Sequence, residues 1–210
     1  MALCVYCAKK AGKRSCPALG GLICPSCCGH HRGIAISCPV SCKYLKTHES
    51  YQRVRLAEEF HALWVEKTEP LYKAGKERSI DLLVWIEMLI YQFYRERALG
   101  TDSEVVEALE FLRRRFSSLI IVEAGGTTLA KHLWEGLQEF LKRESFPAEA
   151  VSEVLEKSLE IFRAYVDPAQ PRRYLHGMLG HVERYFTLPD ELKGSPSLIA
   201  TPQIVTPKMS

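Results

Sequence analysis

Hydrophobic residues recur at helical spacing through most of this chain, from about residue 47 to residue 186. The period of 3.6 residues predicts amphipathic helices, because it gathers apolar side chains on one face. Thr47 caps the first predicted helix, which runs to about Lys67 and is followed by Pro70. Its expected buried stripe is Val54, Leu56, Phe60, Leu63 and Trp64. Five further helices are predicted at about 79–98, 101–116, 127–143, 147–166 and 172–186.

Local signals support several of these boundaries. Thr101 and Glu104 form a capping-box sequence at the start of the third predicted helix. The second helix is apolar over more than half its circumference, which predicts a central helix packed on several sides. Leu119–Val122 is either a short strand or the end of helix three, and Gly125-Gly126 marks a break after it. The pattern predicts an all-α helical bundle.

The first 45 residues have no sustained helical or strand period, and Gly and Pro recur at short intervals. Such a segment has too little apolar surface to fold unaided, so a bound metal is the expected stabiliser. The tail from 189 to 210 is rich in Pro, Ser and Thr and carries a repeated I-x-T-P pattern, which predicts an extended or disordered segment. We therefore expect three parts: a Cys-rich zinc-binding module (1–45), an all-α helical domain (46–188) and the tail (189–210).

All eight cysteines lie in that first segment, and none follows in the remaining 168 residues. The start of the chain has no apolar stretch typical of a secretory signal, so a disulfide framework is not expected. Two cysteines separated by two residues can turn back on one ion, and zinc takes four such ligands in a tetrahedron. The candidate ligands are too many for one site and fit two: Cys4, Cys7, Cys16, Cys24, Cys27, Cys28, His31, Cys38 and Cys42.

Two partitions of these ligands satisfy the spacing. In the first, one ion takes Cys4, Cys7, Cys24 and Cys27, and the other takes Cys16, Cys28 or His31, Cys38 and Cys42. In the second, Cys4 and Cys7 join a Cys-x2-His pair, either Cys27 with His30 or Cys28 with His31. The second ion is then held by Cys16, Cys24, Cys38 and Cys42. An iron–sulfur cluster is the alternative to two zinc ions, because cysteine-only coordination would suit it.

The series of Cys pairs, the late Cys/His element and the final Cys38-x3-Cys42 resemble the cross-braced zinc fingers of the HIT and MYND type. The resemblance covers residues 4–42 and rests on spacing. The adjacent Cys27-Cys28, the lone Cys16 and the Cys-x3-Cys ending depart from those patterns. The resemblance implies a protein-interaction module of the kind found in complexes that handle nucleic acid.

Charge is unevenly distributed along the chain. Residues 1–46 contain seven basic residues and no Asp or Glu, while the remaining residues hold 21 basic and all 25 acidic residues. A cationic loop held rigid by metal suits contact with phosphates. The alternative is that these cations merely offset anionic metal sites. The candidate nucleic-acid-binding residues are Lys9, Lys10, Lys13, Arg14 and Arg32.

No sequence signature of an enzyme is present: the chain lacks GxSxG, GxGxxG, GxxxxGK[ST] and HExxH. His176 and His181 are expected to be surface or boundary residues. The apolar run Ile80–Ile90 is too short and too charged to span a bilayer. We therefore expect a cytoplasmic protein with no membrane partner and no small-molecule substrate.

Three hypotheses for function follow. The first is a non-enzymatic zinc-binding adaptor or regulatory protein that acts on a protein or ribonucleoprotein partner. The second is a regulator that binds DNA or RNA directly through the basic zinc module. The third is a thiol-based redox or metal sensor that uses the spare thiol of the Cys27-Cys28 pair.

Overall fold

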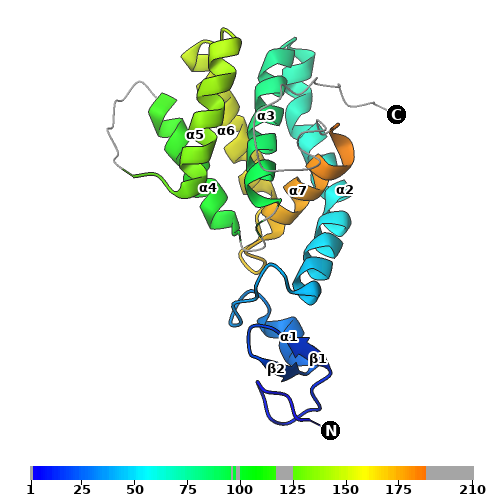
Figure 1. Ribbon diagram of the computed structural model, residues 1–210. Helices are drawn as coiled ribbons and strands as arrows, with labels where there is room; N and C mark the ends of the chain where they lie inside the picture. Colours follow the sequence, from blue (N-terminus) through cyan, green and yellow to red (C-terminus); the bar gives the residue numbers. More distant parts are fainter. Residues whose placement is uncertain (1, 96, 98–99, 117–124, 188–210) are drawn as a thin grey trace. The chain divides into compact units, whose positions relative to one another are not determined.

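The computed structural model describes residues 2–95, 97, 100–116 and 125–187, and it divides into two compact units (Figure 1). The first unit contains Met1–Tyr51 and Glu96–Leu99, and the second contains the rest of the chain. The predicted tail and the predicted element at 119–122 lie outside the described residues. The two units are described in turn.

The first unit has a short hairpin and one short helix. Strands β1 (Arg14–Cys16) and β2 (Gly21–Ile23) pair antiparallel, with Arg14 opposite Ile23 and Cys16 opposite Gly21. Helix α1 (Pro25–His31) follows directly. The sequence pattern predicted neither element, because a three-residue strand and a two-turn helix are too short to show a period.

Cysteines dominate the buried interior of this unit. Its core contains six of them and only three other apolar residues: Ile23, Ile36 and Leu45. A core this small does not offset the entropy of ordering about fifty residues, so an additional stabiliser is required.

Helix α2 spans Lys43–Lys73 and is longer at both ends than the sequence predicted. Pro70 lies inside the helix and does not follow its end, so that expectation was wrong. The helix ends at Gly75, whose φ of +65° is the left-handed conformation that glycine adopts without strain. The N–H groups of Gly75 and Lys76 donate to the carbonyl oxygens of Tyr72 and Leu71, which completes a Schellman ending.

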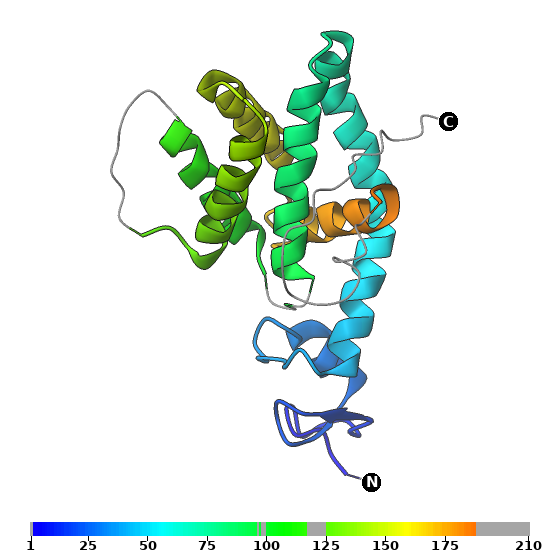
Figure 2. The ribbon, with the colours of Figure 1, turned by 45° about the horizontal axis from the view of Figure 1, so that its top comes forward.

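The second unit is all-helical in its described residues, as predicted. After α2 it contains α3 (Glu77–Tyr94), α4 (Asp102–Phe116), α5 (Thr128–Arg143), α6 (Ala148–Tyr165) and α7 (Arg173–Tyr185). Helix α3 contacts α5, α6 and α7, which confirms its predicted central place; α5 and α6 lie along one side of it (Figure 2). Leu56, Phe60 and Trp64 of α2 are buried as expected, whereas Val54 is 67% exposed, which corrects that part of the stripe.

The cap predicted for the third helix is present in α4. The Thr101 backbone N–H donates to the Glu104 carboxylate at 3.3 Å, and the Glu104 N–H donates to the Thr101 hydroxyl at 3.4 Å. A second cap was not predicted. The buried carboxylate of Asp102 accepts from the backbone N–H groups of Tyr174 and Leu175 at 3.0 and 2.9 Å, which joins α4 to the start of α7.

Candidate metal centre

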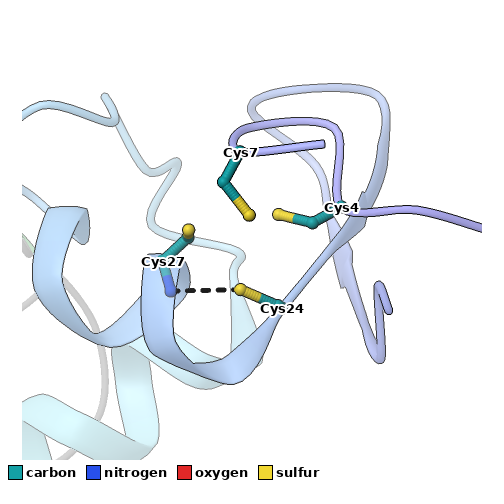
Figure 3. Close-up of side chains that lie close together, drawn as sticks. All are labelled: Cys4, Cys7, Cys24 and Cys27. Carbon is teal, nitrogen blue, oxygen red and sulfur yellow. Dashed lines mark hydrogen bonds between the residues drawn. The ribbon is translucent and has the colours of Figure 1, made fainter. Parts of the chain in front are cut away.

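Four cysteine side chains from two segments of the first unit converge on one point (Figure 3). Cys4 and Cys7 come from the N-terminal loop, and Cys24 and Cys27 come from the start of α1. Their sulfur atoms all lie within 4.8 Å of one another. This is the first site of the first predicted partition, and the alternative with a Cys-x2-His pair does not match this grouping.

The Cys4–Cys7 turn is shaped by a left-handed residue. Ala8 has a φ of 54°, and its N–H donates to the Cys4 carbonyl at 2.8 Å. The turn directs the backbone N–H groups of Lys9 and Lys10 at the Cys7 sulfur, and these hydrogen bonds lower the pKa of that thiol. Such N–H···S contacts stabilise a thiolate, which is the form that binds metal.

Cys24 and Cys27 are held by the beginning of α1. Cys24 is the N-cap residue, Pro25 occupies the first helical position, and the Cys24 sulfur accepts from the Cys27 N–H at 3.4 Å. Proline is favoured at that position because its fixed φ suits the helix and its missing N–H is not needed there. The helix start therefore sets both the spacing and the direction of these two thiols.

The four thiols differ in how readily they lose a proton. Burial opposes ionisation of Cys4, but hydrogen bonds from the backbone of Cys24, Cys7 and Tyr6 outweigh it and lower its pKa to about 6. The hydrogen bond with Cys24, followed by burial, raises the pKa of Cys27 to about 12. A metal ion replaces the protons that remain on such a cluster, so metal binding releases protons.

The chemistry and spacing of this cluster fit a tetrahedral ion. With Zn–S bonds of ~2.3 Å, the sulfurs of a tetrahedral zinc site are about 3.8 Å apart. The observed limit of 4.8 Å requires only small side-chain adjustments to reach that value. Four protein ligands fill every position, which is typical of structural zinc and leaves no place for a catalytic water.

The other four cysteines, Cys16, Cys28, Cys38 and Cys42, belong to the same buried core but are less tightly grouped. Each is between 6% and 8% exposed. Burial raises the pKa of Cys38, the Gly33 N–H lowers it, and negative charge on Cys42, Cys16 and Cys28 raises it again. These three thiols therefore lie close enough to Cys38 to interact with it electrostatically. Among the described residues, only the first set has every ligand atom within 4.8 Å.

The histidines and basic residues named from the sequence lie around these cysteines. The ring of His31 stacks on Tyr6 with centroids 4.4 Å apart, and Nδ1 of His30 lies 2.8 Å from the Ser26 carbonyl. Lys9, Lys10 and Lys13 are exposed. Arg14 and Arg32 are half-buried, and Arg32 donates to the Cys28 sulfur at 3.8 Å.

The spare thiol expected in the Cys27-Cys28 pair is not a free surface group. Cys27 is half-buried and belongs to the first set, and Cys28 is 7% exposed and neighbours Cys38. The two side chains leave α1 in different directions because adjacent helical residues are about 100° apart.

A buried polar cluster in the second unit was not predicted from the sequence. Glu87 on α3 is 2% exposed and accepts from the Trp64 indole N–H at 2.9 Å. Its second oxygen lies 3.9 Å from Nε2 of His181, which is fully buried. The expectation that His176 and His181 are surface residues was therefore wrong, because α7 turns both into the core.

Burial sets the charge of this pair. It raises the pKa of Glu87 to about 8, although the Trp64 hydrogen bond acts in the opposite direction. Burial lowers the pKa of His181 to about 3, and the neighbouring His61 contributes further. Both side chains are thus neutral near pH 7, which avoids the cost of burying a charge.

Comparison with known proteins gives no match to a family model, to a curated protein or to a solved structure. The four-cysteine cluster could hold a metal ion, but no family match supports the resemblance to HIT and MYND fingers. No helix in the described part of the chain is long and apolar enough to cross a membrane.

Proposed function

We propose that this protein is a non-enzymatic zinc-binding adaptor or regulatory protein. Its first unit docks on a protein or ribonucleoprotein partner, and the helical unit offers a second surface. The observation that carries this proposal is the combination of a closed four-thiol site with exposed apolar side chains concentrated in the same unit.

The metal in the proposal is zinc. Four thiolates with N–H···S hydrogen bonds suit zinc, and the absence of an open coordination position suits a structural role. An iron–sulfur cluster is the alternative occupant, because it also takes four cysteines. A cluster would give the purified protein a brown colour and visible absorption, whereas zinc gives neither.

A second zinc ion in the proposal is held by Cys16, Cys28, Cys38 and Cys42. Two observations support this second site. All four cysteines are buried, and Cys16, Cys28 and Cys42 lie close enough to Cys38 to affect its pKa. Four buried free thiols in a unit with almost no other core have no better structural explanation. Binding would draw the sulfurs together and release their protons.

The docking surface follows from exposed apolar side chains. Of the eleven large hydrophobic residues that are prominently exposed in the described part of the chain, eight lie within residues 1–51, including Leu3, Val5, Leu22 and Ile34. Val5 and Leu22 are 52% and 38% exposed, and the Val5 N–H donates to the Leu22 carbonyl at 2.9 Å. Exposed apolar side chains gathered on a small unit are typical of a protein interaction site.

Elemental analysis tests the metal part of the proposal. The wild-type protein is expected to contain two zinc ions per chain, Cys4→Ser is expected to lose one, and Cys38→Ser is expected to lose the other. A Ser26→Ala variant, altered at an exposed position within α1, is the control and should keep both. Protein purified without any metal, with its first unit still ordered, would contradict the proposal.

Affinity capture from the native cell tests the adaptor part. A partner captured by the wild-type protein should be lost with the Val5→Glu/Leu22→Glu variant, because charge cannot be buried at an apolar interface. Val54→Glu is the control, since Val54 is 67% exposed, more than Val5 or Leu22, but belongs to the helical unit. Equal capture by all three proteins would exclude this surface as the docking site.

A further inference from the structure

One open groove of the first unit is lined by cations and tyrosines. It has a volume of about 470 Å³ and is lined by Arg14, Arg32, Lys43, Tyr44, Thr47, His48 and Tyr51. Arg14 starts β1, Arg32 follows α1, and the other residues come from the first turns of α2. Tyr44, Thr47, His48 and Tyr51 share one face of α2 because they are spaced three, four and seven residues apart.

No carboxylate among the described residues neutralises the positive charge in this groove. None of the cations Arg14, Arg32 and Lys43 forms an ion pair with a carboxylate in the described part of the chain. Within residues 1–51 the sequence contains a single carboxylate, Glu49, and it is only 5% exposed. The groove therefore presents net positive charge to solvent, which favours an anionic partner.

Aromatic rings lie beside these charges. The guanidinium of Arg14 is 4.9 Å from the centre of the Tyr44 ring, and the Lys43 ammonium is 5.0 Å from it. Tyr44 thus holds the two cations at the groove. Tyr51 lies two turns further along α2 on the same face, and it is 62% exposed. Its ring remains available to stack on a ligand.

We propose that this groove binds single-stranded nucleic acid. Arg14, Arg32 and Lys43 contact backbone phosphates, and an unstacked base packs on Tyr51. Cations that track a backbone beside an exposed aromatic ring form the usual arrangement for single strands. A duplex would supply phosphates but no unpaired base for the ring, and an acidic protein would supply negative charge but no regular alternation of phosphate and base. Of the five candidate residues named from the sequence, Arg14 and Arg32 line this groove, whereas Lys9, Lys10 and Lys13 do not.

Fluorescence anisotropy with a labelled 12-nucleotide RNA and a 12-base-pair duplex tests the proposal. The single strand should bind at 25 mM salt, and three phosphate contacts predict a slope of about −2 for log K against log salt. Lys43→Glu should weaken binding at least about tenfold, and Lys46→Glu, with the same change in charge on the same helix outside the groove, less than about threefold. Lys9→Glu tests the loop and should resemble Lys46→Glu.

The tyrosine provides an independent test. Tyr51→Ala should weaken binding of the single strand about fivefold or more and leave the duplex nearly unaffected, because stacking requires an unpaired base. Tyr72→Ala is the matched control, since Tyr72 is 55% exposed on the same helix but does not line the groove. Zinc content and far-ultraviolet circular dichroism verify folding, and Lys43→Gln replaces Lys43→Glu if the latter loses metal.

Three results would overturn the proposal: no binding at 25 mM salt, equal weakening by Lys43→Glu and Lys46→Glu, or displacement of the RNA by polyglutamate of the same charge. The last result would identify an acidic protein as the partner of the groove. The inference does not depend on docking through Val5 and Leu22, because neither residue lines the groove.

Discussion

The two units of this protein reach stability by different means. The first unit buries six cysteines with three other apolar residues, while the second has a continuous core drawn from all six of its helices. The pairing of charged side chains also differs between the two units. In the described residues the seven cations of segment 1–46 have no carboxylate partner, whereas ion pairs such as Arg53–Glu183 and Lys76–Glu153 cover the helical unit. Cations without a carboxylate partner and exposed apolar groups are therefore concentrated in the unit whose core consists mostly of cysteines.

Metal removal should have the largest effect and should distinguish the two units most clearly. A strong chelator, or Cys24→Ser, is expected to abolish hydrogen-exchange protection in residues 2–45 and leave α3 to α7 protected, because only the first unit has a core made mostly of cysteines. Hydrogen exchange read by mass spectrometry checks this, with Ser26→Ala as the control. Loss of protection in both units together would show that the helical core also depends on the metal.

A close backbone contact gives the largest expected effect inside the helical unit. A Cβ on Gly180 of α7 would lie 2.1 Å from the carbonyl oxygen of Arg53 on α2, and backbone cannot move aside cheaply. Gly180→Ala should lower the free energy of unfolding by about 3 kcal/mol through overpacking. Gly29→Ala in α1 is the contrasting variant, since no atom lies near its Cβ, and it should be neutral or slightly stabilising. Chemical denaturation measures both.

The buried Glu87 predicts an unusual dependence of stability on pH. Its pKa in the folded state is about 8, above the ordinary value of 4.5. As pH rises, the unfolded chain therefore loses this proton at a lower pH than the folded protein does. The resulting stabilisation is full below about pH 4.5 and is lost as pH rises toward 8, by up to about 1.4 kcal/mol per pH unit. Glu87→Gln, which keeps an oxygen for the Trp64 indole, should remove that loss.

His181 acts in the opposite direction. Its pKa is lowered from 6.5 to about 3. Its contribution to the free energy of unfolding is therefore full above about pH 6.5 and is lost as pH falls toward 3. The two slopes offset each other between about pH 4.5 and 6.5, and stability should decline on both sides of this range. Urea denaturation across pH measures the profile, with the exposed Glu153→Gln as control. Identical profiles for wild type and Glu87→Gln would contradict the assignment.

The smallest effect is expected for a surface ion pair. The ammonium of Lys76 lies 2.6 Å from the Glu153 carboxylate, but both side chains are nearly half exposed. Replacing either residue by alanine should cost about 0.5 kcal/mol or less, because water and salt screen such pairs. A double-mutant cycle at low and high salt measures this coupling. A coupling above about 2 kcal/mol would show that the pair is more than a surface contact.

Sequence periodicity predicted the helical bundle well because each helix repeats its apolar residues every three or four positions. The cap at Thr101 was also predictable, since it depends on neighbours in the sequence. Pro70 misled the prediction of the end of α2, because a proline near a helix end is tolerated when Gly75 completes the last turn. The burial of Glu87 and His181 could not be predicted, since it depends on how α3 and α7 pack.

For the candidate site, the sequence by itself determined which residues carry the chemistry: eight cysteines in 39 positions, with two Cys-x2-Cys pairs, already indicate metal. It left two ligand partitions open, because spacing fixes which thiols share a turn but not which turns meet. Only the tertiary structure decided that the Cys4 turn meets the start of α1, and that Arg14, Arg32 and Lys43 line one groove with Tyr44 and Tyr51. Those groupings depend on the path of the backbone between distant residues, and local sequence does not encode that path.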